Sequence, residues 1–522
     1  MRSDILRTRA RYCPVACLAF GAALFGFAGE ARASNGLDVP DSGAEQVGRG
    51  GAWVALADDP MAAYMNPAAM SFLSHGIHLG AHLMFQSSCF TRLDADGNPV
   101  SPGNNIPGPG AEGGPPAETC ASGIFPNPQL AATFRLTDRL AIGAAVLGPH
   151  AVGAFDWPES VDYQRNGETR SEPAPNRYLL VSQSSLLIYP TLSVSYAVIP
   201  ELSFGASFIW GIAAADFTTF TESTSTTAQE DFTRDVKVNL TTADYFVPGF
   251  ILSSAWRANK FIDLGAWYKF SDAISSNTKL DLTSLYWKAG GTKNDKPCPD
   301  SDPECNHTVA EDAGTLKLTI PMEAKLGVRF HLPLETIEEA PSWSKQEGYV
   351  RDPLSQDRFD VEVDLTWAHN SAVDTIEIRN KPGIKVKGTP GTIPENGDIP
   401  HEWLDVLGVR LGGAVTVLPN VFSLRAGTFF ESQGQSDEYL NLDFDMGWKL
   451  GVSGGGTVRL WPVDVSLAFQ HVFYGTLDNG GKGVVKALSG DASTNFRSQQ
   501  VVNGGSFGSS LNEVALGATL RF

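Results

Sequence analysis

Apolar and polar residues alternate strictly along Met322-Glu323-Ala324-Lys325-Leu326-Gly327-Val328-Arg329-Phe330-His331-Leu332. Every even position is apolar, and every odd position is charged, polar or glycine. Residues 359–367 repeat the pattern, with Asp360, Glu362 and Asp364 on one face and large apolar residues on the other. Because successive side chains of a β-strand point to opposite faces, this period of two predicts strands with one apolar and one polar face.

Two folds could use such strands. In a soluble sandwich the apolar face packs inside, whereas in an outer-membrane barrel it faces lipid and the charged face lines the lumen. The alternating segments are close to the roughly 9–11 residues that a tilted membrane strand requires. The chain also stops on an alternating segment, 513–522, whose last residue is Phe522, as is typical of outer-membrane proteins. These features favour the barrel.

Short turns and long polar segments alternate between the predicted strands, as they do in bacterial barrels with short periplasmic turns and longer outside loops. The short links are 137–139, 199–201, 419–420 and 461–462, and the long segments are 91–126, 149–177, 276–313, 381–402 and 475–509. One link departs from the pattern, because 333–357 is long and charged where a short turn is due. We interpret it as an insertion of unknown role.

Counting the alternating segments gives the whole architecture. Strands are predicted near 77–90, 127–137, 139–148, 180–198, 202–215, 243–257, 261–274, 315–332, 358–370, 404–418, 421–432, 444–460, 463–474 and 510–522. The prediction is an all-β fold, a transmembrane antiparallel barrel of about fourteen strands spanning 77–522 with long extracellular loops.

The first 33 residues have the organisation of a secretory signal peptide. Several arginines precede an apolar run at 15–28, and Ala31-Arg32-Ala33 follows as a cleavage site. We therefore assign 1–33 to the signal. Beyond it, no stretch approaches the roughly 20 apolar residues of a membrane helix. The formal net charge of −19 argues against nucleic-acid binding.

A segment between the signal and the first strand, 34–76, has a different composition. It contains Gly48-Arg49-Gly50-Gly51-Ala52, then Ala57-Asp58-Asp59-Pro60, then Asn66-Pro67-Ala68. Its glycines allow tight backbone approach, and its prolines indicate turns or helix starts. With so few large apolar residues it cannot form a core of its own, so it needs an enclosure. In this order, after a signal peptide, these motifs resemble the N-terminal plug of the FadL-type outer-membrane transporters of hydrophobic compounds.

The resemblance implies a plug inside the barrel, in which Gly48, Gly50, Asn66, Pro67 and Ala68 match the family's motif. It also implies passive transport of long-chain fatty acids or other hydrophobic compounds, such as aromatic hydrocarbons. In this family the loops capture the molecule, the plug moves, and the molecule leaves sideways through a gap at the third strand.

Here that third strand ends on Gly148-Pro149, a plausible place to break the hydrogen-bond ladder, since proline has no N–H to donate. We also expect an outer-membrane location among outer-membrane lipid, insertion by the barrel assembly machinery, and a monomer.

Charged residues on the polar faces of the predicted strands would line the lumen. Lys325, Arg329, Arg410 and Arg425 are candidates to hold the carboxylate head group of a ligand, since an unpaired cation binds a carboxylate. The alternative is structural: acids and bases neutralise one another and link the strands. The sequence leaves both interpretations open.

Four cysteines follow the predicted signal: Cys89, Cys120, Cys298 and Cys305. An exported chain meets an oxidising compartment, so two local loop disulfides are expected, without a fixed pairing. Cys298 and Cys305 are too widely spaced for a zinc knuckle, and we expect neither a metal site nor a cofactor.

No G-x-S-x-G sequence stands at a predicted strand-to-helix turn, as a nucleophile elbow requires, and the H-E-x-x-H and Walker-type motifs are absent, so we do not expect an enzyme. The enzyme alternative is a barrel phospholipase, which would need a Ser-His pair fixed by a third group. The main alternative to a transporter is a structural or adhesive barrel that acts through its long loops.

Overall fold

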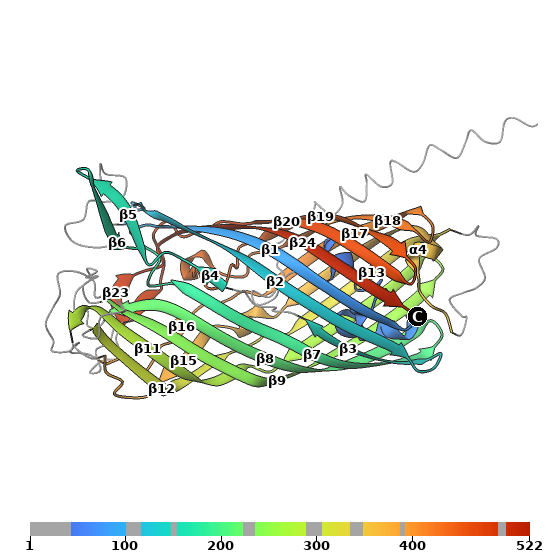
Figure 1. The fold of residues 1–522 in the computed structure, drawn as a ribbon, viewed down its shortest axis with the longest axis horizontal. Coiled ribbons are helices and arrows are strands. Elements are labelled where there is room, and N and C mark those ends of the chain that lie inside the picture. The colour runs from blue at the N-terminus through green and yellow to red at the C-terminus, as the bar shows by residue number, and fades with distance from the viewer. Residues whose placement is uncertain are drawn as a thin grey trace, which may run out of the picture.

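The computed structural model describes residues 43–100, 116–147, 154–222, 235–288, 305–334, 348–386, 392–488 and 497–522. These residues form a closed antiparallel barrel of fourteen strands, as predicted (Figure 1). The barrel closes where the first strand pairs with the last, from Gly76 opposite Arg521 to Arg92 opposite Gly505. The predicted signal peptide lies outside the described residues.

Several wall strands consist of two consecutive elements that pair with the same neighbour. In order around the wall the strands are β1 (Gly76–Arg92), β2 (Glu118–Arg135), β3 (Leu140–Leu147) with β4 (Ala154–Asp156), β7 (Ser182–Ile199), β8 (Leu202–Glu222), β9 (Asp235–Asn259), β10 (Ile262–Ser271) with β11 (Ile274–Lys288), β12 (Cys305–Leu318) with β13 (Glu323–Pro333), β14 (Asp357–Ala368) with β15 (Thr375–Asn380), β16 (Ile399–Pro400) with β17 (Val406–Leu418), β18 (Phe422–Glu431), β19 (Lys449–Leu460), β20 (Val463–Tyr474) with β21 (Leu477–Asp478), and β24 (Gly505–Arg521).

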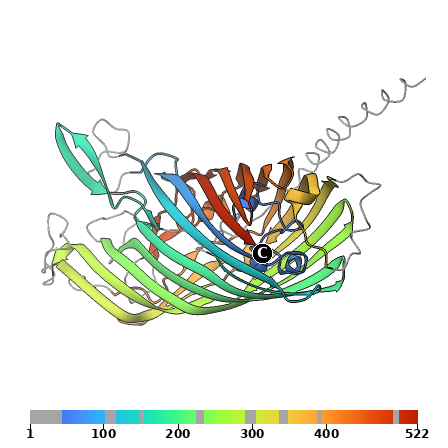
Figure 2. The ribbon, with the colours of Figure 1, turned by 45° about the vertical axis from the view of Figure 1, so that its right-hand side comes forward.

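The remaining described elements are short. They are α2 (Ala44–Val47), α3 (Ala62–Met65), η1 (Pro67–Phe72), α4 (Pro353–Gln356), η4 (Asn370–Ala372), η5 (Asp437–Tyr439), the hairpin β5 (Ser160–Arg165) with β6 (Glu168–Pro173), and the pair β22 (Lys486–Leu488) with β23 (Arg497–Val501). None of the described helices is long and apolar enough to cross a membrane. The β5–β6 hairpin projects from the end of the barrel opposite the C-terminus (Figures 1 and 2).

The period-two pattern has the polarity of a membrane barrel. On β13, Leu326 and Val328 point outward and are 58% and 52% exposed, whereas Arg329 points inward and is 1% exposed. A soluble sandwich would bury the apolar face instead. The exposed apolar face and the buried charged face therefore define a wall between lipid and a filled lumen.

Toward the end of the barrel opposite the C-terminus, the apolar face of the wall points inward and the polar face points outward. Odd-numbered residues of β10 point inward, including the buried Lys269, but after a break at residues 272–273 the even-numbered residues of β11 do so, including Leu280 and Leu282. A shift of one residue moves every side chain of a strand to the other face. The interior is therefore polar near the C-terminal end and apolar beyond Ile274.

This inversion explains the main error of the strand prediction. Residues 276–313 were expected to be a long loop, but β11 and β12 cover most of them. Their outward side chains are polar, so the segment has a loop-like composition although it continues the wall. β2 also begins earlier than predicted, at Glu118, inside the segment 91–126 that was expected to be a loop.

Candidate functional site

Residues 43–73, here called the luminal segment, fill the lumen near the C-terminal end of the barrel (Figures 1 and 2). Each residue of the segment is buried, although it contains mostly small side chains and only short helices. A segment of this composition has no core of its own. The barrel wall supplies the enclosure that the sequence requires.

Three carboxylates on the inner face of β14 hold the luminal segment. Asp364 Oδ2 accepts hydrogen bonds from two successive backbone N–H groups of residues 53–54, at 2.9 and 3.1 Å. Glu362 Oε1 accepts from the next N–H group at 2.6 Å, and Asp360 forms an ion pair with Arg49. All these groups are buried, so each bond also satisfies a donor that water cannot reach.

Glycines of the wall let the backbone of the luminal segment approach closely. Gly265 of β10 and Gly327 of β13 lie opposite each other, as do Gly412 of β17 and Gly427 of β18. A Cβ at any of these four positions would overlap with the backbone of the segment, at residues 54–55 for the first pair and at residues 49–50 for the second. Glycine is the residue type that permits such contact.

The five residues predicted for the plug all lie in this packed region. Gly50 has φ of 61°, and a Cβ there would overlap with the backbone of β18. Asn66 donates from Nδ2 to the backbone carbonyl twelve residues earlier at 2.7 Å. Pro67 begins η1, the N–H of Ala68 donates to a serine hydroxyl of β9 at 2.9 Å, and Gly48 caps α2. Their role in gating stays a prediction.

A second segment, residues 348–357, presses on the luminal segment from the C-terminal end of the barrel; we call it the strap. Arg351 donates from Nη1 to the carbonyl of Ala55 at 2.9 Å, and its backbone N–H donates to the carbonyl of Phe72 at 2.7 Å. Asp352 receives two hydrogen bonds from Arg459 of β19, at 2.8 and 2.9 Å. The strap belongs to the link 333–357 that sequence analysis left without a role.

Two acids in the luminal segment have raised pKa values. Burial, with the charge of Glu45 adding to it, raises the pKa of Asp58 to about 6. Burial and the charge of Asp58 raise the pKa of Asp59 to about 7, although Asp59 accepts a hydrogen bond from the N–H of Met61 at 2.7 Å. Deprotonation of this pair therefore opposes the packed arrangement.

The four predicted head-group cations each contact another side chain. Arg329 lies 2.9 Å from Asp263 and 3.3 Å from Asp360, Arg410 lies 2.6 Å from Glu431, Arg425 lies 3.0 Å from Glu45, and Lys325 lies over the ring of Trp267 at 4.7 Å. Three of them thus have the neutralising partners of the structural alternative. Their assignment as head-group ligands stays a prediction.

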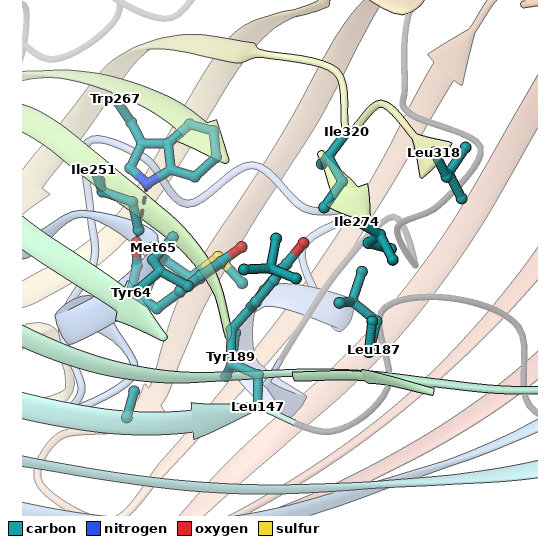
Figure 3. Packing of buried hydrophobic residues seen from close by; sticks show 14 of the residues in the cluster. Tyr64, Met65, Leu147, Leu187, Tyr189, Ile251, Trp267, Ile274, Leu318 and Ile320 are labelled. Carbon is teal, nitrogen blue, oxygen red and sulfur yellow. Dashed lines mark hydrogen bonds between the residues drawn. The ribbon is translucent and has the colours of Figure 1, made fainter. Parts of the chain in front are cut away.

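Two adjoining apolar cavities lie beyond the luminal segment, inside the inverted part of the wall. Their volumes, taken as the space open to the centre of a water molecule, are about 100 and about 50 Å³, and both are lined by Phe217, Leu316 and Ile376. Figure 3 shows Leu187, Ile274 and Leu318, which line the smaller cavity, in one buried cluster with the aromatic side chains at the luminal segment. Together they form an apolar space inside the barrel.

An aromatic group connects the luminal segment with these cavities. Tyr64 of the segment stacks on Tyr189 with ring centroids 6.2 Å apart, and its carbonyl accepts a hydrogen bond from Trp267 Nε1 at 2.9 Å (Figure 3). Tyr64 belongs to the same buried apolar cluster as the cavity residues. A displacement of the segment would therefore disturb the apolar cluster to which several cavity residues belong.

Residues 432–448, here called the inward loop, fold into the lumen against the cavities. Leu440, Leu442, Phe444 and Met446 are buried, Phe444 lines the smaller cavity, and Asp443 lines the larger one. The prediction of a strand starting at 444 was wrong here, because β19 begins at Lys449. The alternating apolar residues of the loop imitate a strand.

The ladder next to β2 is asymmetric. Its pairing with β1 extends over sixteen residue pairs, from Gly76 opposite Thr133 to Thr91 opposite Glu118, whereas its pairing with β3 covers only 129–135. Within the described residues, 118–128 of β2 have no ladder partner on that second side. The predicted gap residues, Gly148 and Pro149, lie outside the described residues.

A disulfide joins Cys89 of β1 to Cys120 of β2, at directly opposite positions of the ladder. The bond therefore links two wall strands rather than two loops, because β2 extends further than predicted. Cys298 lies outside the described residues, and Cys305 is the first residue of β12.

A closed barrel with a lipid-facing apolar surface, a packed luminal segment and an internal apolar cavity belongs to the class of transmembrane β-barrels. The sequence profile of one family, "Outer membrane protein transport protein (OMPP1/FadL/TodX)", matches residues 26–335. The chain belongs to this family, and it is an outer-membrane protein. A search of curated protein sequences found no match.

Solved structures share the fold at low sequence identity. A Pseudomonas aeruginosa FadL homologue has 17% identity and a TM-score of 0.64, with 94% of this chain and 100% of that chain covered. The Pseudomonas putida toluene transporter TodX has 14% identity and a TM-score of 0.57, covering 94% and 100%. The Ralstonia pickettii toluene transporter TbuX has 12% identity and a TM-score of 0.53, covering 92% and 99%.

Proposed function

We propose that this protein is a passive outer-membrane transporter of hydrophobic compounds, with fatty acids and hydrocarbons as the two candidate classes. The two adjoining apolar cavities carry the proposal, because they lie between the outer end of the barrel and a luminal segment that fills the other end. A hydrophobic molecule leaves water when it enters such a cavity, which requires no energy source. We propose that the barrel acts as a monomer inserted by the barrel assembly machinery.

Sideways exit is the route that we propose for the last step. The luminal segment and the strap obstruct the axial route, since the wall, Arg351 and Asp352 hold them together. The short ladder between β2 and β3 supports an exit there. Phe125 of β2 and Phe155 of β4 stack at 6.1 Å beside it, and Trp157 packs on Phe155 at 5.8 Å, so the way from the cavities to this part of the wall is apolar.

The test is protein-dependent uptake of labelled toluene and labelled laurate into outer-membrane vesicles with and without this protein. Leu316, which lines both cavities, is replaced in the variant Leu316→Trp to fill them. We expect uptake to fall at least fivefold. Leu326→Trp is the matched control, because Leu326 faces outward and is 58% exposed. Equal uptake by the two variants would contradict the proposal.

A second variant tests the luminal segment. Deleting 66–68 removes the Asn66 bond and the Ala68 bond to β9, so we expect a changed rate of uptake from a correctly inserted barrel. No uptake of either compound by the unaltered protein, with the barrel correctly inserted, would favour a barrel that acts through its loops.

A further inference from the structure

We infer that Asp443 makes the larger cavity selective for neutral hydrophobic molecules over carboxylate anions. The inference rests on the proposed transport function and concerns which of its candidate substrates the cavity accepts. It is carried by the position of Asp443 and by the charges of the residues around the two cavities.

Asp443 is held in place by the inward loop. Its Oδ1 accepts a hydrogen bond from the N–H of Phe444 at 2.9 Å, and its Oδ2 lies 3.1 Å from Nε2 of His401. Phe444 packs edge-on against Trp403 at 5.5 Å, and His401 lies 5.2 Å from the same ring. The carboxylate is 7% exposed and lines the cavity, so it cannot turn away into solvent.

The charges around both cavities have one sign. Asp443 is the one charged residue among those that line the larger cavity, and Asp244 is the one among those that line the smaller cavity. Neither lining includes a lysine, arginine or histidine among the described residues. The four cations considered as head-group ligands are not part of either lining and contact other side chains of the protein.

This arrangement disfavours an anionic guest for two physical reasons. A carboxylate that enters an apolar cavity loses its hydration without gaining a cationic partner. It also comes close to a like charge in a region where water screens poorly. The methyl ester of a fatty acid has the same apolar chain as the acid. It carries no charge, so it neither loses the hydration of a carboxylate nor is repelled by Asp443. A hydrophobic ammonium ion loses hydration but is attracted by Asp443.

The experiment compares labelled methyl laurate, laurate and dodecylammonium at pH 8 in outer-membrane vesicles, and counts only the uptake that depends on the protein. We expect the unaltered protein to take up the ester at least tenfold faster than laurate, with dodecylammonium in between. In Asp443→Asn, which keeps the volume and an acceptor for the Phe444 N–H, we expect the ester-to-laurate ratio to fall at least threefold.

Asp445→Asn is the matched control, because Asp445 lies in the same loop, accepts from the N–H of Gly447 at 3.1 Å and lines neither cavity. Its ratio should equal that of the unaltered protein. Laurate uptake as fast as that of the ester or of dodecylammonium would overturn the inference without any variant. An unchanged ratio in a folded Asp443→Asn protein would overturn it too. If none of the three compounds is taken up, the transport function itself fails.

Discussion

Near its C-terminal end the barrel wall presents glycines and paired charges to the interior, whereas at the other end the same wall presents Leu, Ile and Phe. The change occurs within single strands: Lys269 of β10 and Leu280 of β11 both point inward, on either side of the break at 272–273. The polar half binds a piece of its own chain through directional bonds. The apolar half surrounds its larger cavity mainly with aliphatic side chains and leaves about 100 Å³ there open to the centre of a water molecule. Directional polar contacts thus fix a segment in place, and apolar walls leave space for a guest.

The largest effect is expected where the wall and the luminal segment touch through backbone alone. In Gly427→Leu the new side chain would overlap with the backbone at Arg49, so the segment must move. Overpacking of this kind costs about 3 kcal/mol. We expect a lower thermal unfolding temperature and rapid proteolysis within 43–73. Gly454→Leu is the control, since the nearest atom to a Cβ there is 3.6 Å away.

Removing one carboxylate of β14 should have a smaller effect. Asp364→Ala leaves the two N–H groups of residues 53–54 buried without their acceptor. We expect a loss of about 2 kcal/mol in the free energy of unfolding, measured by denaturant titration in detergent. Glu311→Ala removes a carboxylate that is 73% exposed and should leave that free energy nearly unchanged. Equal losses in both variants would contradict the role given to β14.

The strap should matter for sealing more than for folding. Arg351→Ala removes the hydrogen bond to the Ala55 carbonyl and the contact with Asp263 at 3.3 Å. We expect about 1 kcal/mol of lost stability and a clear rise in ion conductance across planar bilayers. Arg358→Ala, at an exposed position of β14, is the control. An unchanged conductance in Arg351→Ala would show that the strap does not seal the barrel.

The smallest effect is a pH dependence. The ordinary pKa of 3.8 is raised in the folded state to about 6 for Asp58 and about 7 for Asp59. The folded state therefore holds protons that the released segment gives up, so this stabilisation is complete below about pH 4 and disappears as pH rises through 7. Protection from hydrogen exchange within 43–73, relative to the exchange rate of the unfolded chain at the same pH, should be lower at pH 8 than at pH 5. Asp58→Asn with Asp59→Asn should remove the difference, whereas a difference that persists would point to other groups.

Local patterns in the sequence predicted the wall and the unusual N-terminal segment, because period-two alternation and glycine content are local properties. The partners within the site could not be predicted in this way. Asp360, Glu362 and Asp364 were recognised as facing the lumen, but their partners lie about 310 residues away in the chain, and no local spacing encodes that contact. Residues 444–448, the last part of the inward loop, were assigned to a strand because Leu440 to Met446 alternate as a strand would.

The disulfide between Cys89 and Cys120 makes the two edges of β2 differ in mechanical strength. A disulfide joins β2 to β1 near one end, and the two strands are hydrogen-bonded along their length. The opposite edge of β2 has only a short ladder with β3. A force on β2 should therefore separate β2 from β3 and leave β2 attached to β1. This difference between the two edges of β2 depends in part on one disulfide, and disulfides form in oxidising compartments.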